Sequence, residues 1–253
     1  MSRVIVGVGD RADVRELILA GRAVAGLWGA ETVAVHVNGA AETEMVAHLQ
    51  RQGAVLDLRP GDPHSVLKTL AAEADVEAVV VGSGTTHTPL GVSRFTEVLI
   101  TELTTPVLVV PTGSCALTAL RRVLVPLEDE VASSPQLFRW LAAMQRRNVT
   151  ARLLHIHAPE TVPAFADHEP YATETWGAEF LSRRLATGGG HGDLWREVGL
   201  PAEEIIARCR PDVADLVVLS WSQVPGEGRA PVIAETLSHS EIPVLLLAAD
   251  GTG

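Results

Sequence analysis

Two kinds of hydrophobic pattern alternate along the chain. Short runs of consecutive apolar residues, such as Arg3–Val8 and Glu77–Val81, are rich in valine, which is typical of strands buried on both faces of a parallel sheet. Between such runs lie longer stretches, such as Asp13–Trp28, where apolar residues recur every three or four positions and predict helices with one apolar face. This alternation predicts an α/β fold in which helices cover both faces of a parallel sheet.

The same patterns locate the individual elements. In the first half the predicted strands are Arg3–Val8, Thr32–Val37, Val55–Arg59, Glu77–Val81 and Pro106–Val110, and the predicted helices are Asp13–Trp28, Ala41–Arg51, Asp62–Ala74 and Ser93–Leu103. In the second half the predicted strands are Arg122–Leu127, Thr150–Ile156, Leu216–Leu219 and Pro243–Leu247, and the predicted helices are Ser134–Arg147, Glu174–Leu185, Pro201–Cys209 and Ala230–His239. We therefore expect two doubly wound domains, each with a mostly five-stranded parallel sheet.

The two halves repeat one another. Ile5–Val8 recurs as Leu124–Leu127, 119 positions later (124 − 5), and Val80–Gly82 recurs as Val218–Ser220, 138 positions later (218 − 80). A period of this length is a duplicated domain, because solenoid repeats are only roughly 20–50 residues long. The sequence predicts domains at 1–113 and 119–250, a linker at 112–120, and most of the extra length of the second half at 157–192.

Composition narrows the classes of partner. The chain is 47% apolar and 20% charged, with a formal net charge of −11. Nucleic acids and anionic membranes select for surplus lysine and arginine, so neither is an expected partner. Two cysteines provide no disulfide framework, and the first residues already read as a strand instead of an export signal, so we expect a cytoplasmic protein.

Several ordered pieces of sequence resemble the universal stress protein family. They are Val35-His36-Val37 at the end of the second strand, Gly61-Asp62-Pro63 before a helix, the run Val79–Gly84, and the last strand Pro106–Val110. The resemblance covers almost the whole chain, in tandem. It implies five-stranded parallel α/β domains and a role in regulation or stress response. In that family some members bind ATP and dimerise through their last strand, whereas others bind no nucleotide.

The resemblance also directs attention to the loop after the fourth strand. ATP-binding members carry glycines there, with a glycine and a hydroxyl residue at the close, so that backbone amides and a helix N-terminus can bind phosphates. The first half has Gly82-Ser83-Gly84, but Thr85 stands at the second glycine position and Ser93-Arg94 at the closing pair. The second half has Ser220 and Ala230-Pro231 instead. Any ATP, with its Mg²⁺, is therefore predicted in the first domain only.

The predicted nucleotide site is the crevice outside the carboxyl ends of the first and fourth strands. Its residues are expected to be Gly7, Val8, Gly9, Asp10, Val37, Gly82, Ser83, Gly84, Ser93 and Arg94. Val37 would lie beside the adenine, and Gly82 to Arg94 around the phosphates. Two alternatives stay open: Asp10 could be a turn residue bonded to its own backbone, and Arg94 a solvated surface residue.

Catalytic and metal chemistry find little support. His155 and His157 would share a strand face, but two histidines at a strand end also suit contacts with loop backbone, and we expect no metal site. Glu128-Asp129-Glu130 could bind Mg²⁺ or form a solvated turn, of which we prefer the turn. No serine lies in a nucleophile elbow, so no catalytic residue and no enzyme are predicted.

Three functional hypotheses follow. The first is a regulatory protein that binds an adenine nucleotide. The alternatives are a nucleotide-free scaffold for an unknown protein partner, and a weak ATP hydrolase. The duplicated chain could be a monomer that acts as a pseudo-dimer. It could also form a homodimer of tandems, because the two last strands would offer edges to another chain.

Overall fold

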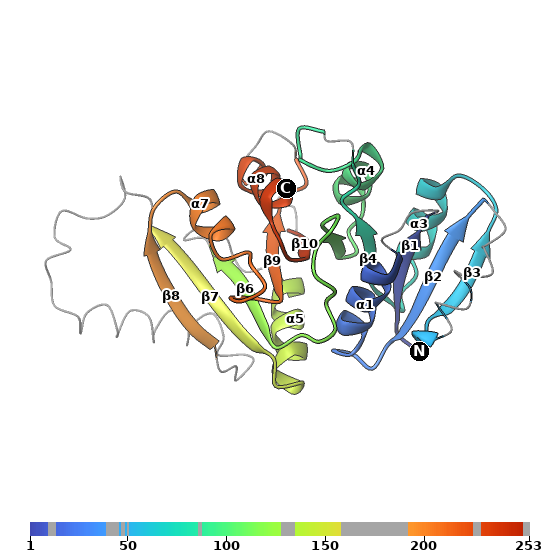
Figure 1. Cartoon of the computed structure of the whole chain (residues 1–253), viewed down its shortest axis with the longest axis horizontal. Coiled ribbons are helices and arrows are strands. Elements are labelled where there is room, and N and C mark those ends of the chain that lie inside the picture. Colours follow the sequence, from blue (N-terminus) through green and yellow to red (C-terminus); the bar gives the residue numbers. More distant parts are fainter. Residues whose placement is uncertain are drawn as a thin grey trace, which may run out of the picture.

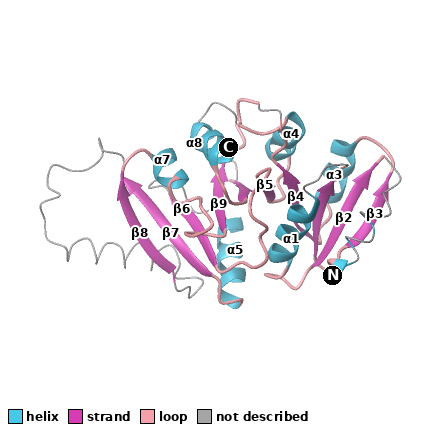
Figure 2. Cartoon of the chain, viewed as in Figure 1, coloured by secondary structure: helices cyan, strands magenta, loops and turns pink. Residues whose placement is uncertain are grey.

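The computed structural model describes residues 1–9, 14–38, 46, 49, 51–85, 88–127, 135–157, 192–224 and 229–249. The strands are β1 (Arg3–Val8), β2 (Glu31–Val37), β3 (Val55–Arg59), β4 (Val76–Gly82), β5 (Val107–Val110), β6 (Arg122–Leu127), β7 (Thr150–His157), β8 (Gly192–Val198), β9 (Leu216–Trp221) and β10 (Val244–Ala248). The helices are α1 (Val14–Ala25), α3 (Pro63–Ala71), α4 (Arg94–Glu102), α5 (Pro135–Arg146), α7 (Pro201–Ile206) and α8 (Ala230–His239) (Figure 1, Figure 2).

The described strands form one continuous sheet. Its order is β3-β2-β1-β4-β5-β10-β9-β6-β7-β8, so the two halves of the sheet are built alike from either end. Neighbouring strands within each half are parallel, whereas β5 and β10 pair antiparallel, with Leu108 opposite Leu245. The last strands of the two halves therefore pair with each other. The expectation that these strands offer free edges to another chain is wrong.

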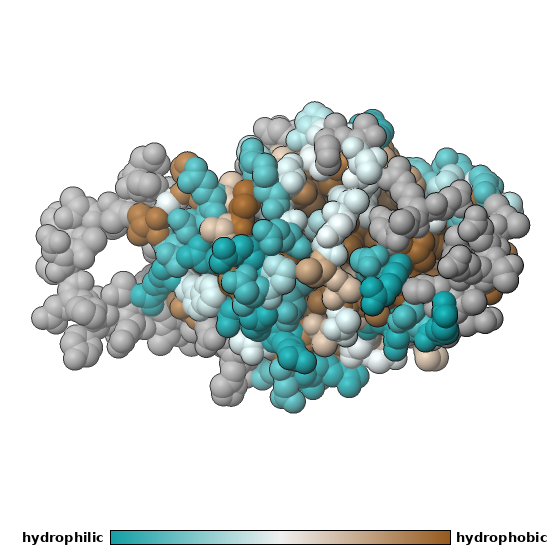
Figure 3. All heavy atoms as spheres, in the orientation of Figure 1, coloured by the Kyte–Doolittle hydropathy of each residue, from teal (hydrophilic) through white to brown (hydrophobic). Residues whose placement is uncertain are grey.

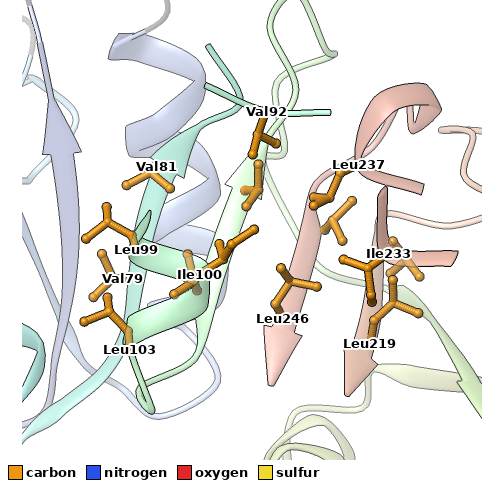
Figure 4. Packing of buried hydrophobic residues seen from close by; sticks show 14 of the residues in the cluster. Val79, Val81, Val92, Leu99, Ile100, Leu103, Leu219, Ile233, Leu237 and Leu246 are labelled. Carbon is orange, nitrogen blue, oxygen red and sulfur yellow. The ribbon is translucent and has the colours of Figure 1, made fainter. Parts of the chain in front are cut away.

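Alternate residues of each strand face two separate cores. In β4, Val79 and Val81 face the core beneath α3, α4, α7 and α8, whereas Ala78 and Val80 face the core beneath α1 and α5. Both cores contain residues from both halves of the chain. Figure 4 shows the first core crossing the junction, from Leu99 and Ile100 of α4 to Ile233 and Leu237 of α8. Near-continuous apolar strands are required because both faces of the sheet are covered.

Polar and aromatic contacts also join the halves. The rings of Trp28, which follows α1, and Trp140 of α5 meet edge to face with centroids 4.3 Å apart. Arg139 of α5 forms an ion pair with the buried Glu77 of β4 at 2.5 Å. The side-chain amide of Gln223 donates to the carbonyl oxygens of Ile100 and Leu103 at the end of α4. The junction is thus held on both faces of the sheet.

The fold class and most of the predicted elements are confirmed, with ends that differ by a few residues. The strand β8 (Gly192–Val198) was not predicted, because its Asp193, Arg196 and Glu197 interrupt the apolar pattern, as suits a strand at the sheet edge. The predicted helix Ala41–Arg51 lies largely outside the described residues, and Glu174–Leu185 lies wholly outside them.

The described surface is mostly polar on the face shown in Figure 3, where hydrophilic residues cover the larger area. Among the described residues, no helix combines the length and apolar character needed to cross a membrane. Both cysteines are free thiols. Cys115 is exposed, whereas burial raises the pKa of the Cys209 thiol to about 12.

Candidate functional site

The carboxyl ends of β1 and β4 lie side by side. These strands pair directly, with Val6 opposite Val80, so the backbone after Val8 and the backbone after Gly82 leave the sheet at the same edge. Space around Gly7 is tight, since a Cβ there would lie 3.0 Å from a methyl group of Leu67, whereas Gly9 is exposed and has open space around it. Asp10 lies outside the described residues.

The end of β2 completes this edge on the other side of β1. His36 is buried, and its Nδ1 donates to the carbonyl oxygen of Val8 at 3.2 Å, which fixes the end of β1. Val37, the next residue, is half-buried and packs on the core beneath α3 and α4. Sequence reasoning used His36 only as a family marker. The contact could have been expected from the sequence, because His36 lies near the end of a predicted strand that neighbours the first strand.

The loop after β4 closes on itself through Ser93. The backbone amide of Ser93 donates to the carbonyl oxygen of Ser83 at 2.7 Å. Gly84 has φ +76°, and a Cβ at this position would lie 2.5 Å from the Cβ of Ser93. Only glycine fits such a left-handed position so close to another side chain. The structure thus brings together three of the predicted residues, Ser83, Gly84 and Ser93.

Thr112, which was not predicted, holds the other side of this loop. Its backbone amide donates to the buried Ser83 Oγ at 3.1 Å, and its own hydroxyl donates to the carbonyl oxygen of Gly84 at 3.3 Å. Thr112 follows the end of β5 by two positions, and β5 pairs with β4. Because neighbouring parallel strands end at the same edge of a sheet, the position of Thr112 just after β5 could have indicated a contact with the loop after β4. The Ser83 hydroxyl predicted to face phosphate is engaged by the start of the linker.

The N-terminus of α4 is fastened to the end of β4. Ser93 is the N-cap, and its Oγ accepts from the Thr96 amide at 3.3 Å and lies 3.0 Å from the Thr96 hydroxyl. That hydroxyl lies 2.8 Å from the carbonyl oxygen of Gly82 and donates to it. A helix N-terminus carries partial positive charge and exposed amide donors, which attract anions. Here it points at the strand ends where the nucleotide was predicted.

Arg94 is turned along the outside of α4. Its guanidinium donates to Glu97 Oε2 at 2.7 Å, and its side chain is 80% exposed. A phosphate contact from Arg94 would require this pair to open. The described geometry therefore resembles the surface alternative more than the phosphate alternative.

The equivalent place in the second half has different residues. Trp221 follows Ser220 at the end of β9 and is buried. The guanidinium of Arg229 donates to the Ser220 carbonyl oxygen at 3.1 Å, and α8 begins without a side-chain cap, with Pro231 in its first turn. A ring, a guanidinium and a proline thus replace the hydroxyls of the first half.

Two cavities of the described residues lie at the opposite, amino-terminal ends of the strands. One, of about 280 Å³, is lined by the linker, Arg121, Arg122 and Asp215. The other, of about 270 Å³, lies between the halves beside Glu77 and Arg139. The first lies at the starts of β9 and β10, and the second lies at the starts of β4 and β5, which are the equivalent strands of the first half. Neither coincides with the predicted nucleotide crevice.

Within the described ranges, no group of three His, Cys, Asp or Glu side chains is arranged to hold a metal ion. His155 is fully buried at the end of β7, the place equivalent to His36 in β2. The side chain of His157 and residues 128–130 lie outside the described part of the chain.

Comparison with known proteins gives a family and a set of similar folds. The model of the Universal stress protein family matches residues 119–248, slightly more than half of the chain. A functionally unknown protein from Pseudomonas aeruginosa PAO1 is similar in structure (TM-score 0.69, 13% identity), covering 99% of this chain and 93% of that chain. A universal stress protein from Archaeoglobus fulgidus DSM 4304 gives a TM-score of 0.66 at 13% identity, with 99% and 97% covered.

The cytoplasmic domain of a prokaryotic cation chloride cotransporter is also similar (TM-score 0.54, 12% identity), covering 97% of this chain and 94% of that domain. No curated protein sequence gives a significant match. At these identities the structural likenesses establish the fold, over nearly the full length of each protein.

Proposed function

Because this chain belongs to the universal stress protein family, we propose that it is a regulatory protein whose first half binds an adenine nucleotide. The observation that carries the proposal is the closure of Gly84 on Ser93 at the N-terminus of α4, beside the end of β1. This arrangement offers backbone amides and a helix N-terminus to phosphate. The base would lie toward Val8, Gly9 and Val37.

The second half is not expected to bind nucleotide in this way. Pro231 has no N–H to donate, and the buried Trp221 together with Arg229 takes the place of the hydroxyl groups. In the proposal this half serves as the structural partner of the first. The family match falls on the second half, residues 119–248, so the nucleotide assignment rests on the geometry of the first half alone.

Two contacts favour the alternative of a nucleotide-free scaffold for a protein partner. Ser83 Oγ is already engaged by Thr112, and Arg94 is already paired with Glu97. Under both hypotheses the chain binds a partner, either a nucleotide or a protein, and does not catalyse a reaction. We further propose that it acts in the cytoplasm. An ATPase assay with Mg²⁺ tests the catalytic alternative, since hydrolysis that is lost in a folded Ser93→Ala variant and kept in Asp62→Ala would support an enzyme.

Thermal unfolding with and without Mg-ATP or AMP separates the two binding hypotheses. A ligand at 100 times its dissociation constant stabilises by about 2.7 kcal/mol, which raises the midpoint by a few degrees. We expect such a shift in the native chain and its loss in Ser93→Ala.

The matched control is Asp62→Ala, which removes the N-cap of α3 and should keep the ligand shift. No shift with either nucleotide in the native chain would refute nucleotide binding and favour the scaffold.

A further inference from the structure

Part of the loop after β4 is packed into the second half of the chain. Leu90 and Val92 are buried, at 4% and 0% exposure, and belong to the same core as Ile233 and Leu237 of α8. Figure 4 shows Val92 and Leu237 at the same end of this junction, above the pairing of β5 with β10. The loop that the first half offers to a nucleotide therefore has a wall made by the second half.

The contact between the two is a backbone contact at Gly91. Gly91 has φ +74°, and a Cβ there would lie 2.0 Å from Ser238 Oγ and 3.1 Å from the carbonyl oxygen of Ala234. Ser238 Oγ donates to that same carbonyl at 2.7 Å, so the hydroxyl is held within its own helix. A Cβ at Gly91 would displace the Ser238 hydroxyl, and it would still lie 3.0 Å from Ser238 Cβ and 3.1 Å from the Ala234 carbonyl oxygen, so the loop or α8 would also have to shift by a few tenths of an ångström.

Residues 88–93 of this loop are held by backbone hydrogen bonds. Gly91 N–H donates to the carbonyl oxygen of Thr88, and Thr88 N–H donates to that of Val92, each at 2.8 Å, which closes a tight turn. At its end, Ser93 is bonded to Ser83 and caps α4. The turn formed by residues 88–92 therefore leads directly into Ser93, which contacts Ser83 and Gly84 in the proposed nucleotide site.

We propose that Ser238 and Ala234 of the second half are positioning residues for the loop of the first half. By supporting Gly91 they hold the closed shape in which Gly84 meets Ser93. The packing of α8 thereby sets the shape of the loop, and a ligand that reshapes the loop moves α8. The claim that a ligand moves α8 rests on the proposed nucleotide function, whereas the claim that α8 holds the loop does not depend on it.

Two glycine substitutions separate this contact from general backbone strain. Gly91 and Gly113 have nearly the same φ, +74° and +78°, but a Cβ at Gly113 would have nothing within 4 Å. Gly91→Ala and Gly113→Ala thus bear similar left-handed strain, and only the first presses on α8. We expect Gly91→Ala to speed amide hydrogen exchange in residues 230–239 about tenfold, with Gly113→Ala unchanged there. Adding Ser238→Ala to Gly91→Ala should recover part of the protection.

The ligand arm uses AMP and Mg-ATP on the native chain. Slower exchange in both the loop and α8 on adding nucleotide would support the coupling, whereas slowing confined to the loop would overturn it. Equal exchange of α8 in the two glycine variants, or no recovery by Ser238→Ala, would overturn the positioning role whether or not nucleotide binds. The expected variant results without any nucleotide binding would support positioning and refute the proposed function instead.

Discussion

The loop after β4 and the loop after β9 occupy equivalent places in one sheet but carry different chemistry. In the first half, Gly84 and Ser93 close a hydroxyl-lined loop on a capped helix. In the second half, Arg229 lies against the strand end and α8 starts without a side-chain cap. The fold alone therefore creates only the position at the strand ends. Whether that position can receive an anion depends on the few residues between strand and helix.

A second difference of the same kind separates α3 from α7. The residues before these helices have almost identical backbone angles, φ −81° and ψ 126° at Asp62 against φ −78° and ψ 126° at Leu200. Asp62 accepts from the Ser65 amide, whereas Leu200 makes no side-chain cap. In the first half, α3 and α4 thus begin with side-chain caps, whereas α7 and α8 of the second half begin without them.

The largest expected effect comes from a substitution that disrupts the contact between the two halves. Trp140→Ala removes a side chain that is 1% exposed and packs on Trp28 of the other half. Loss of a buried tryptophan costs about 4 kcal/mol of unfolding free energy. Urea unfolding measures the loss. Trp195→Ala, a half-buried tryptophan within the second half, should cost less, and an equal loss in both variants would contradict a special role for this contact.

A smaller loss is expected at the loop itself. Gly84→Ala would force a left-handed alanine against Ser93 and cost about 3 kcal/mol. Ser222, the equivalent position in the second half (84 + 138), is exposed, and its change to alanine should alter stability by less than about 0.5 kcal/mol. Paired urea titrations compare the two. Similar values for both would mean that the loops do not differ as described.

A modest gain is expected from giving the second half the cap of the first. Leu200→Asp places a carboxylate on a backbone already suited to capping, and Leu200 is 54% exposed, so little packing is lost. The expected gain is roughly 0.5–1 kcal/mol, reduced by the nearby Glu203 and Glu204. Thermal unfolding against Leu200→Ala as control checks this. A destabilised Leu200→Asp would show that the similar angles do not make the two helix starts equivalent.

The smallest effect concerns acid sensitivity. Hydrogen bonds from the Ser65 amide and hydroxyl lower the pKa of Asp62 below its ordinary 3.8. The unfolded chain therefore binds more protons than the folded chain as the pH falls through this range, and the stability from the charged cap, complete above 3.8, is lost. Asp62→Asn keeps an acceptor but cannot titrate. Urea midpoints of native chain and variant should converge or cross as acid is added, and parallel curves would contradict the lowered pKa.

The sequence predicted the fold well because the inner strands, such as β4 and β5, are buried on both faces of the sheet. Short valine runs such as Val79–Val81, which alternate with helical patterns, are typical of covered parallel strands, and the Asp62-Pro63 pair marked a helix start that the structure confirms. Of the two edge strands, β3 was predicted because it keeps Val55, Leu56 and Leu58, whereas β8 escaped because Asp193, Arg196 and Glu197 interrupt its apolar pattern.

The site was less accessible to sequence reasoning because its contacts join distant parts of the chain. Gly84 and Ser93 could be placed near each other in the site from the resemblance of the loop after the fourth strand to the family's glycine motif. The engagement of Ser83 by Thr112 and the packing of Gly91 on Ser238 depend on how the two halves meet. The prediction of free last-strand edges failed for the same reason, since periodicity within each half does not reveal that β5 and β10 pair with each other.

The pairing of β5 with β10 inside a single polypeptide changes what a substitution can do. In a dimer of identical chains every change occurs on both sides of the two-fold axis, so an interface must remain complementary to itself. Here Gly91 and Ser238 lie in different halves of one chain, so each can change without the same change occurring in the other half. The two halves also stay together at any dilution, because they are covalently connected. A single chain thereby keeps two unlike halves together in a one-to-one ratio, and a change in one half is not imposed on the other.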